Sequence, residues 1–198
     1  RYSSSAASDV YKRQLIYHIL KKAGLDVGLA GNIGDSFSKM LLSGDKDIYV
    51  LEISSFQLDD IKKFRPNISV ITNINEDHMD RYENDFGKYV DAKIKIAKNQ
   101  KSSDYLIYNC DDKVLLEALR VNKLEVNKIP IGINNKRQNQ ITLDKKILYN
   151  KKKTIMINTD EFALKGRHNL LNAMAAITVS DLLKICLLYT SPSPRDCQ

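Results

Sequence analysis

The sequence has few cysteines and no long apolar run, and these absences exclude two classes of protein. Its cysteines, Cys110, Cys186 and Cys197, form no C-x-x-C pair and leave an odd thiol, which argues against a disulfide framework and suits a reducing compartment. No stretch approaches the roughly 18 apolar residues that a membrane-spanning helix needs. Neither end has the pattern of a targeting peptide. We therefore expect a cytoplasmic protein that has no membrane partner.

Two nucleotide-related motifs are also missing. No G-x-x-x-x-G-K-[ST] loop occurs in the 198 residues, so the chain lacks the usual backbone cradle for ATP phosphates. No RNA-binding motif with interleaved aromatic residues accompanies the net charge of +7. The densest basic cluster, Lys145, Lys146, Lys151, Lys152 and Lys153, flanks a predicted hairpin, and we interpret it as a solvated edge. We predict no nucleic-acid partner, while anionic small substrates would suit the positive charge.

The two ends of the chain differ in character from its middle. Residues 1–14 cluster serines without a strand pattern, and residues 185–198 interrupt a helical pattern with Pro-Ser repeats. We interpret both as non-native sequence, such as translated adapter or vector, around a fragment of a longer gene at residues 15–184. Ordinary flexible termini are the alternative. A chain of this length is expected to bury one sizeable core.

Between these ends, helix and strand patterns alternate, which predicts parallel strand pairing. The predicted helices are 15–23, 36–42, 55–64, 85–99 and 113–119, and the predicted strands between them are 26–30, 48–53, 68–73 and 105–108. Later strands at 129–133, 140–143, 146–149 and 154–157 predict a small antiparallel sheet, followed by an amphipathic helix at 169–183. We therefore predict an α/β fold with a doubly wound, mostly parallel sheet flanked by helices, and a small antiparallel sheet.

Polar side chains follow two strongly apolar runs, at the points where the predicted strands end. Glu52 comes directly after residues 48–51, and Asp77 and His78 follow residues 68–71 after a short loop. Open α/β sheets bind ligands at the carboxyl ends of their strands, so we expect these three side chains to meet in one crevice. A helix cap or salt bridge is the alternative role for Glu52, and a hydrogen-bonded loop residue is the alternative for His78.

Four segments in a fixed order carry a resemblance to a known family. They are Gly31-Asn32-Ile33-Gly34, Glu52-Ile53-Ser54-Ser55-Phe56-Gln57-Leu58, Glu76-Asp77-His78-Met79-Asp80-Arg81-Tyr82 and Gly166-Arg167-His168-Asn169-Leu170-Leu171-Asn172. Together they resemble the central domain of the Mur ligases, from about residue 15 to about residue 183. The Ser-Ser-Phe-Gln-Leu sequence is similar to that of the branch that adds D-glutamate. The resemblance implies a P-loop-type domain whose first strand and phosphate loop would precede residue 15.

The resemblance also implies a metal site that serves ATP. Glu52 would help to hold Mg²⁺, which prefers hard oxygen ligands, and His78 would bind a second metal ion beside the acyl phosphate. Lys93, fifteen residues after His78, would be carbamylated by CO₂ and so become an anion that positions this second metal ion. Asp77 and Asp80 would orient the loop, whereas Lys95 and Lys98 are expected to be solvated.

Further residues would bind the two large substrates. By resemblance, Asn32, Ser54 and Gln57 would contact the UDP-muramoyl substrate. A capping role is the alternative for Ser54. His168, Asn169 and Asn172 would bind the nucleotide, because two asparagines three positions apart on one helix face can offer amides to the adenine edge. Core or capping asparagines are the alternative.

The resemblance implies an amide ligase of peptidoglycan precursor synthesis. ATP would convert the carboxylate of UDP-N-acetylmuramoyl-L-alanine to an acyl phosphate, which the amine of D-glutamate attacks. We expect a monomer, and we predict that this chain is inactive by itself because its phosphate loop is missing. Two alternatives stay open: another Mur-type or folylpolyglutamate-type ligase, and a non-catalytic nucleotide-binding module.

Overall fold

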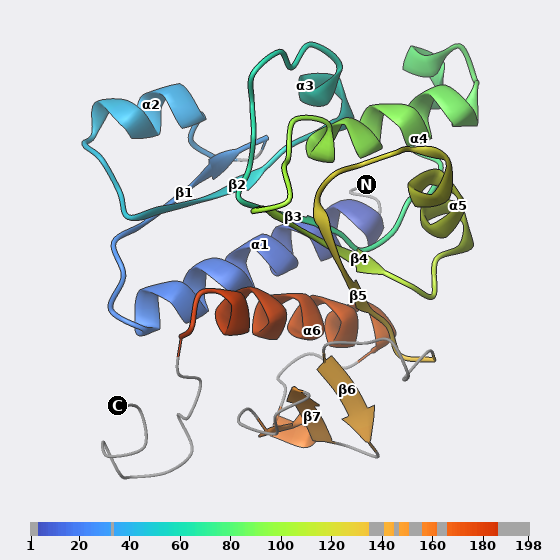
Figure 1. The fold of residues 1–198 in the computed structure, drawn as a ribbon. Coiled ribbons are helices and arrows are strands. Elements are labelled where there is room, and N and C mark those ends of the chain that lie inside the picture. The colour runs from blue at the N-terminus through green and yellow to red at the C-terminus, as the bar shows by residue number, and fades with distance from the viewer. Residues whose placement is uncertain are drawn as a thin grey trace, which may run out of the picture. The chain divides into compact units, whose positions relative to one another are not determined.

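The computed structural model describes residues 4–32, 34–134, 141–144, 147–150, 156–161 and 166–185. These residues form two compact units (Figure 1). Unit 1 combines residues 1–52 with 140–198, and unit 2 comprises residues 53–139. The basic cluster at 145–153, Ile33 and the two cysteines near the C-terminus lie wholly or largely outside the described residues, as does the segment 186–198.

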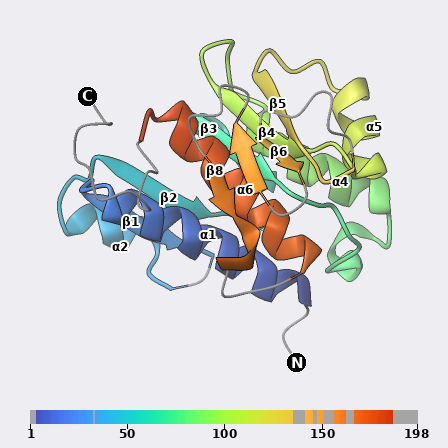
Figure 2. The ribbon, with the colours of Figure 1, turned by 90° about the horizontal axis from the view of Figure 1, so that it is seen from below.

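Unit 1 combines a parallel strand pair, a small antiparallel sheet and helices. Its elements are α1 (Ser4–Lys22), β1 (Val27–Gly31), α2 (Phe37–Leu42), β2 (Ile48–Glu52), β6 (Ile141–Asp144), β7 (Ile147–Asn150), β8 (Met156–Asn158), the 3₁₀ turn η3 (Thr159–Glu161) and α6 (Arg167–Leu182). Strands β1 and β2 run parallel, whereas β6, β7 and β8 pair antiparallel. Helices α1 and α6 lie side by side (Figures 1 and 2).

Unit 2 is a three-stranded parallel sheet with helices. Its elements are α3 (Ser55–Asp59), β3 (Ile68–Ile71), the 3₁₀ turn η1 (Met79–Tyr82), α4 (Phe86–Ile94), η2 (Lys95–Ala97), β4 (Tyr105–Asn109), α5 (Lys113–Val121) and β5 (Asn127–Ile131). The strand order is β3-β4-β5. Its core consists of the apolar faces of α4 and α5 together with buried sheet residues such as Leu106, which is fully buried. Burial of such side chains is the main favourable term in folding.

The structure confirms the predicted α/β class, with parallel strands flanked by helices and a small antiparallel sheet. The predicted strand at 129–133 was wrongly placed in the antiparallel sheet, since it corresponds to β5, which pairs parallel with β4. Three helices differ clearly from their predicted lengths. Helix α4, predicted over 85–99, ends at Ile94 and is followed by the 3₁₀ turn η2. Helix α1 starts at Ser4 instead of Leu15, since no glycine or proline interrupts that segment. Helix α3 ends at Asp59, not Phe64, and the backbone carbonyls of Lys62 and Phe64 beyond its end accept hydrogen bonds from the amide of Asn99 at 3.1 and 2.9 Å.

Helix α6 corrects a further prediction. The expected amphipathic helix is instead buried continuously from Leu171 to Ser180. A helix that is buried on all sides needs no polar face. The hydroxyls of Thr178 and Ser180 donate to carbonyls one turn earlier, at 2.7 and 2.9 Å, so their polar groups are satisfied inside the helix.

In the part of the chain that the structure describes, no helix is both long enough and apolar enough to span a membrane.

Candidate functional site

The carboxyl ends of β1 and β2 meet closely because of a glycine. Gly31 has a φ of +129°, and a Cβ atom at this position would lie 2.1 Å from the carbonyl oxygen of Glu52. The backbone N–H of Asn32 donates to that same oxygen at 2.7 Å. The absent side chain of Gly31 therefore lets two candidate site residues, Asn32 and Glu52, sit together at the carboxyl ends of adjacent parallel strands.

Glu52 has a cationic neighbour that the sequence did not predict. Its carboxylate lies 3.6 Å from the guanidinium of Arg13 on α1, and only 16% of its side chain is exposed. Arg13 is buried as well. A positive charge stands beside the carboxylate that was predicted to bind a metal ion. The salt bridge named as an alternative role for Glu52 is therefore present in this structure.

The three candidate nucleotide-binding residues on α6 lie in different environments. His168 is exposed in the first turn and Asn169 is half-buried, whereas Asn172 is 1% exposed. Gly166 caps the helix with a φ of 111°. His168 and Asn169 can therefore be reached by a ligand, whereas Asn172 lies in the interior in the arrangement seen here.

In unit 2, Ser54 and Gln57 bind each other around the start of α3. The Ser54 hydroxyl accepts the N–H of Gln57 at 3.4 Å, and the side-chain oxygen of Gln57 accepts the N–H of Ser54 at 3.0 Å. This reciprocal pair is a capping box. The capping alternative for Ser54 is thus realised, and the amide nitrogen of the exposed Gln57 side chain still remains for a ligand.

His78 precedes the η1 turn as its N-cap and has an unusual backbone conformation. Its φ of 50° and ψ of 38° place it in the left-handed region, which histidine visits more readily than most residues. Its imidazole Nε2 lies 3.8 Å from the Asp77 carboxylate, and 59% of its side chain is exposed. This geometry presents an imidazole and a carboxylate together to solvent.

Lys93 lies on α4 with its ammonium 5.1 Å from the centre of the Tyr89 ring. This is a cation–π contact of the unmodified side chain. The carbamylated form and the metal role of Lys93 stay predictions. Lys98 is exposed as predicted, but Lys95 is not simply solvated, since its ammonium pairs with Asp59 at 2.9 Å.

An aromatic group in unit 2 escaped the sequence analysis. The rings of Phe56, Tyr82 and Tyr89 follow one another with centroids 6.3 and 5.4 Å apart. The Tyr82 hydroxyl donates to Asp59 at 3.1 Å, and burial, with help from this carboxylate, raises the pKa of Tyr82. Phe56 and Tyr82 lie in two of the four segments that carry the family resemblance, and this placement was the sequence signal that could have identified them. Their contact depends on tertiary packing.

Within each unit, the structure brings some of the candidates together. Asn32 and Glu52 adjoin in unit 1, and Ser54, Gln57 and His78 lie on or against α3 in unit 2. The crevice expected to unite Glu52 with Asp77 and His78 involves residues of both units and stays a prediction. Among the described residues, no three His, Cys, Asp or Glu side chains form a metal-binding group.

With this geometry in hand, comparison with known proteins identifies the class. Residues 13–180 match the model of the Mur ligase middle domain, and the chain belongs to the Mur ligase family. A relative from Christiangramia forsetii, named UDP-N-acetylmuramoylalanine--D-glutamate ligase, is 44% identical over 174 residues, which are 86% of this chain and 39% of the relative. A protein of the same name from Bacteroides thetaiotaomicron is 38% identical over 82% of this chain and 37% of its own length.

Solved structures agree on the fold. MurF from Acinetobacter baumannii superposes with a TM-score of 0.69 at 16% identity, covering 90% of this chain and 41% of MurF. MurF ligase from Thermotoga maritima in complex with ADP gives 0.65 at 18% identity, covering 93% of this chain and 47% of that chain. The chain spans about two fifths of the length of the curated relatives that it matches.

Proposed function

We propose that this chain is the central domain of an ATP-dependent ligase that joins D-glutamate to UDP-N-acetylmuramoyl-L-alanine during peptidoglycan precursor synthesis. The names of relatives at 38 and 44% identity support this substrate pair. The structural observation that carries the proposal is the junction at Gly31, which sets Asn32 and Glu52 at the carboxyl ends of β1 and β2. Ligands of open α/β sheets bind at this edge.

The proposed reaction has two steps. A carboxylate oxygen of the muramoyl-alanine substrate attacks the γ-phosphorus of ATP, and ADP leaves. The amine nitrogen of D-glutamate then attacks the acyl carbon, phosphate leaves, and the nitrogen loses a proton as the amide forms. Because the reaction consumes ATP, we propose that the enzyme works in the cytoplasm on these three small molecules.

The donor groups fit a hydrated magnesium ion better than a protein-only metal cage. Mg²⁺ commonly keeps several waters and takes one or two carboxylates together with substrate phosphates, and Glu52 supplies one largely buried carboxylate. When bound, such an ion would neutralise charge on the phosphates. His78, with Asp77 beside it, would hold a second ion. Lys93 would contribute once its side chain left the Tyr89 ring, lost a proton and, as the neutral amine, added CO₂ with release of a second proton to form a carbamate. We propose this carbamate as the form in the active enzyme.

The remaining candidates would hold the organic substrates. The exposed Gln57 amide and the side chain of Asn32 would donate hydrogen bonds to the muramoyl substrate, with Ser54 holding Gln57 in place. His168 and Asn169, at the accessible start of α6, would contact the nucleotide, whereas Asn172 would support this turn from the interior.

A chimera tests the proposal. Residues 15–182 of this chain replace the matching segment of the C. forsetii ligase, and ADP release is measured with and without D-glutamate. We expect release that depends on D-glutamate and on the muramoyl substrate. Glu52→Gln should reduce turnover by at least about 10²-fold, the size typical of losing one electrostatic partner of the transition state.

The matched control is Glu117→Gln, which changes an exposed glutamate on α5 and should leave turnover unchanged. A folded chimera that binds both substrates without D-glutamate-dependent ADP release would refute the proposal. The unfused chain of 198 residues should release no ADP, since it contains no G-x-x-x-x-G-K-[ST] loop.

A further inference from the structure

Two of the four segments that resemble the family contain aromatic residues to which the proposed function gives no role. Phe56 lies in the Ser-Ser-Phe-Gln-Leu segment, and Tyr82 ends the segment that contains His78. From their contacts we infer that Phe56 is a positioning residue, whose ring holds the imidazole of His78 in place. This inference rests on the proposed function, in which His78 is a metal ligand.

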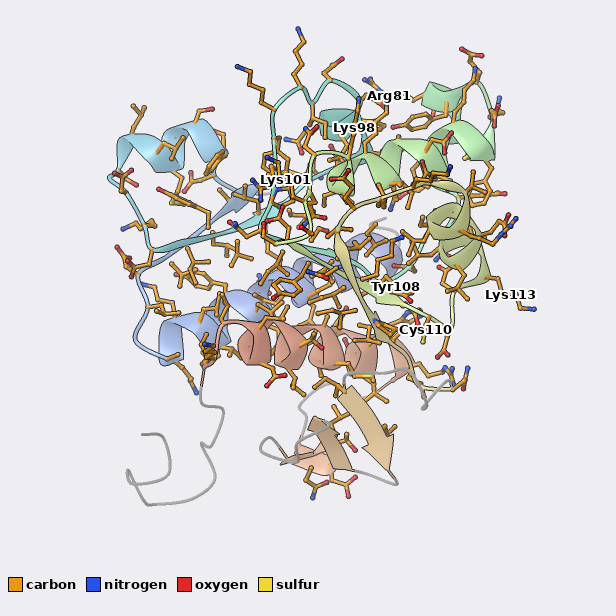
Figure 3. All side chains as sticks on the ribbon, in the orientation of Figure 1. Arg81, Lys98, Lys101, Tyr108, Cys110 and Lys113 are labelled. Carbon is orange, nitrogen blue, oxygen red and sulfur yellow. The ribbon has the colours of Figure 1, made fainter. Side chains whose placement is uncertain are left out.

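Phe56 contacts the His78 loop at two points. Its ring centroid lies 5.1 Å from that of His78, with the two planes inclined by 59°. The guanidinium carbon of Arg81 lies over the same ring, 4.5 Å from its centroid. Figure 3 shows Arg81 beside α3, the helix that carries Phe56. One phenylalanine therefore contacts two side chains that are three positions apart in the loop.

Phe56 is itself held firmly. The Ser54–Gln57 capping box fixes the short helix on which it stands. Its other neighbour, Tyr82, stacks on it with planes inclined by 25°, is buried, and is tied by its hydroxyl to Asp59. Because packing and hydrogen bonds fix the position of the Phe56 ring, this ring can restrain a neighbouring side chain, which a mobile ring could not do.

Apart from Phe56, little of the described surroundings restrains the His78 side chain. Most of its side chain is exposed, and the 3.8 Å separation from Asp77 exceeds hydrogen-bond length. An exposed side chain exchanges rotamers readily, and a metal ligand must give up that freedom on binding. Packing against Phe56 removes part of this freedom beforehand, which raises the affinity for the ion.

Proton NMR of the chain offers a direct test of this positioning role without any ligand. Its only histidines are His18, His78 and His168, so imidazole C–H signals are few, and His78→Gln assigns the one of interest. Phe56→Leu should move the His78 signals toward random-coil positions, because the ring current is lost. Phe56→Tyr keeps the ring and should retain the wild-type positions. Phe56→Met serves as a second ring-free variant if the leucine variant does not fold.

The matched control removes a different phenylalanine of the same core. Phe86 stacks on Tyr89, with centroids 6.2 Å apart, and not on His78. Phe86→Leu should leave the His78 signals in place. In every variant, unchanged signals from His18 and His168 show that unit 1 is intact, and amide signals of β4 report on the core of unit 2.

Titration with Mn²⁺ supplies the second readout. The ion should broaden the His78 signals of the wild-type chain, and Phe56→Leu should raise the half-broadening concentration about tenfold, as loss of a supporting contact typically does. Identical His78 signals in folded wild-type and Phe56→Leu chains would overturn the positioning role. If Phe56 governs the signals but Mn²⁺ does not broaden them, the positioning role is supported and the proposed metal role of His78 is overturned.

Discussion

Gly31 illustrates, at the scale of the residue, how one missing side chain shapes the candidate site. Its positive φ and the 2.1 Å approach that a Cβ would make to Glu52 mean that any other residue must push β1 and β2 apart. Gly24, after α1, also has a positive φ, but a Cβ there would meet nothing within 4 Å. A substitution at Gly24 would therefore cause backbone strain alone, whereas one at Gly31 would add steric overlap.

Gly24→Ala should lower the free energy of unfolding by about 1 kcal/mol, the cost of placing a side chain in the left-handed region. Gly31→Ala should lower it by about 3 kcal/mol or more, because overlap with the Glu52 carbonyl adds to that cost. Urea unfolding followed by circular dichroism measures both. Equal losses in the two variants would show that the strand ends can separate freely.

Glu52 shows a limit of reading residues one at a time. Its place after an apolar run predicted a functional carboxylate at a strand end, and the structure puts it there. Its pairing with Arg13 joins residues 39 positions apart, with α1 packed against β2. No local pattern encodes such a contact. The sequence therefore suggested a salt bridge as an alternative role for Glu52 but could not identify Arg13 as its partner.

At the scale of the element, the capping box of α3 combines a structural role with a proposed substrate role. A helix of five residues gains little from its own hydrogen bonds, so its start depends on the cap. Helix α2 provides a comparison, since Ser36 caps it by accepting the N–H of Lys39 at 3.2 Å, and no site role is assigned there.

Ser54→Ala and Ser36→Ala should each cost about 1 kcal/mol of stability, the usual value of an N-cap. In the chimeric enzyme, Ser54→Ala should also raise the KM for the muramoyl substrate, whereas Ser36→Ala should not. Thermal unfolding and steady-state kinetics test the two parts separately. If both variants change KM alike, the capping box has no special relation to the substrate.

The sequence predicted the type of an element, helix or strand, correctly wherever the local pattern of apolar residues was strong. The apolar runs at 48–51 and 68–71 became β2 and β3, and Gly24 follows α1 as expected. Boundaries failed where a distant group intervened. Beyond the early end of α3, the carbonyls of Lys62 and Phe64 accept hydrogen bonds from the amide of Asn99, and periodicity carries no information about that contact.

At the scale of the whole molecule, an ion pair between the exposed Arg65 and the buried Asp104 links two segments of unit 2. Asp104, 1% exposed before β4, accepts hydrogen bonds from Nε and Nη2 of Arg65 at 2.6 and 3.0 Å and from the N–H of Lys101 at 2.8 Å. The bond from Arg65 holds the pKa of the Asp104 carboxyl below its ordinary value. The pair joins the segment before β3 to the segment before β4.

The free energy of unfolding of unit 2 should therefore depend on pH in the acid range. Because the pKa of Asp104 is lower in the folded than in the unfolded chain, its contribution is complete above about pH 4, near the unfolded pKa, and is lost as pH falls through the folded pKa. Asp104→Asn should cost about 1.5–3 kcal/mol at neutral pH and flatten the acid limb of the stability curve. Unfolding measured from pH 7 down to acid tests this.

The exposed pair of Glu117 and Arg120 provides the control for that prediction. The pKa of Glu117 is also lowered by its bond to Arg120, but water screens both side chains. Glu117→Gln should therefore leave the pH profile nearly unchanged. An acid limb that flattens equally in both variants would argue against a special role for the buried Asp104 carboxylate.

The sequence by itself determined the α/β class, the order of the elements and the membership of the Mur ligase family. Those properties depend on local periodicity and on short motifs, which are complete within a few residues. Only the tertiary structure decided that Gly31 brings Asn32 to Glu52, that Arg13 faces that carboxylate and that Phe56 packs on His78. Each of these contacts joins segments far apart in the chain, and their geometry is set by how whole elements pack.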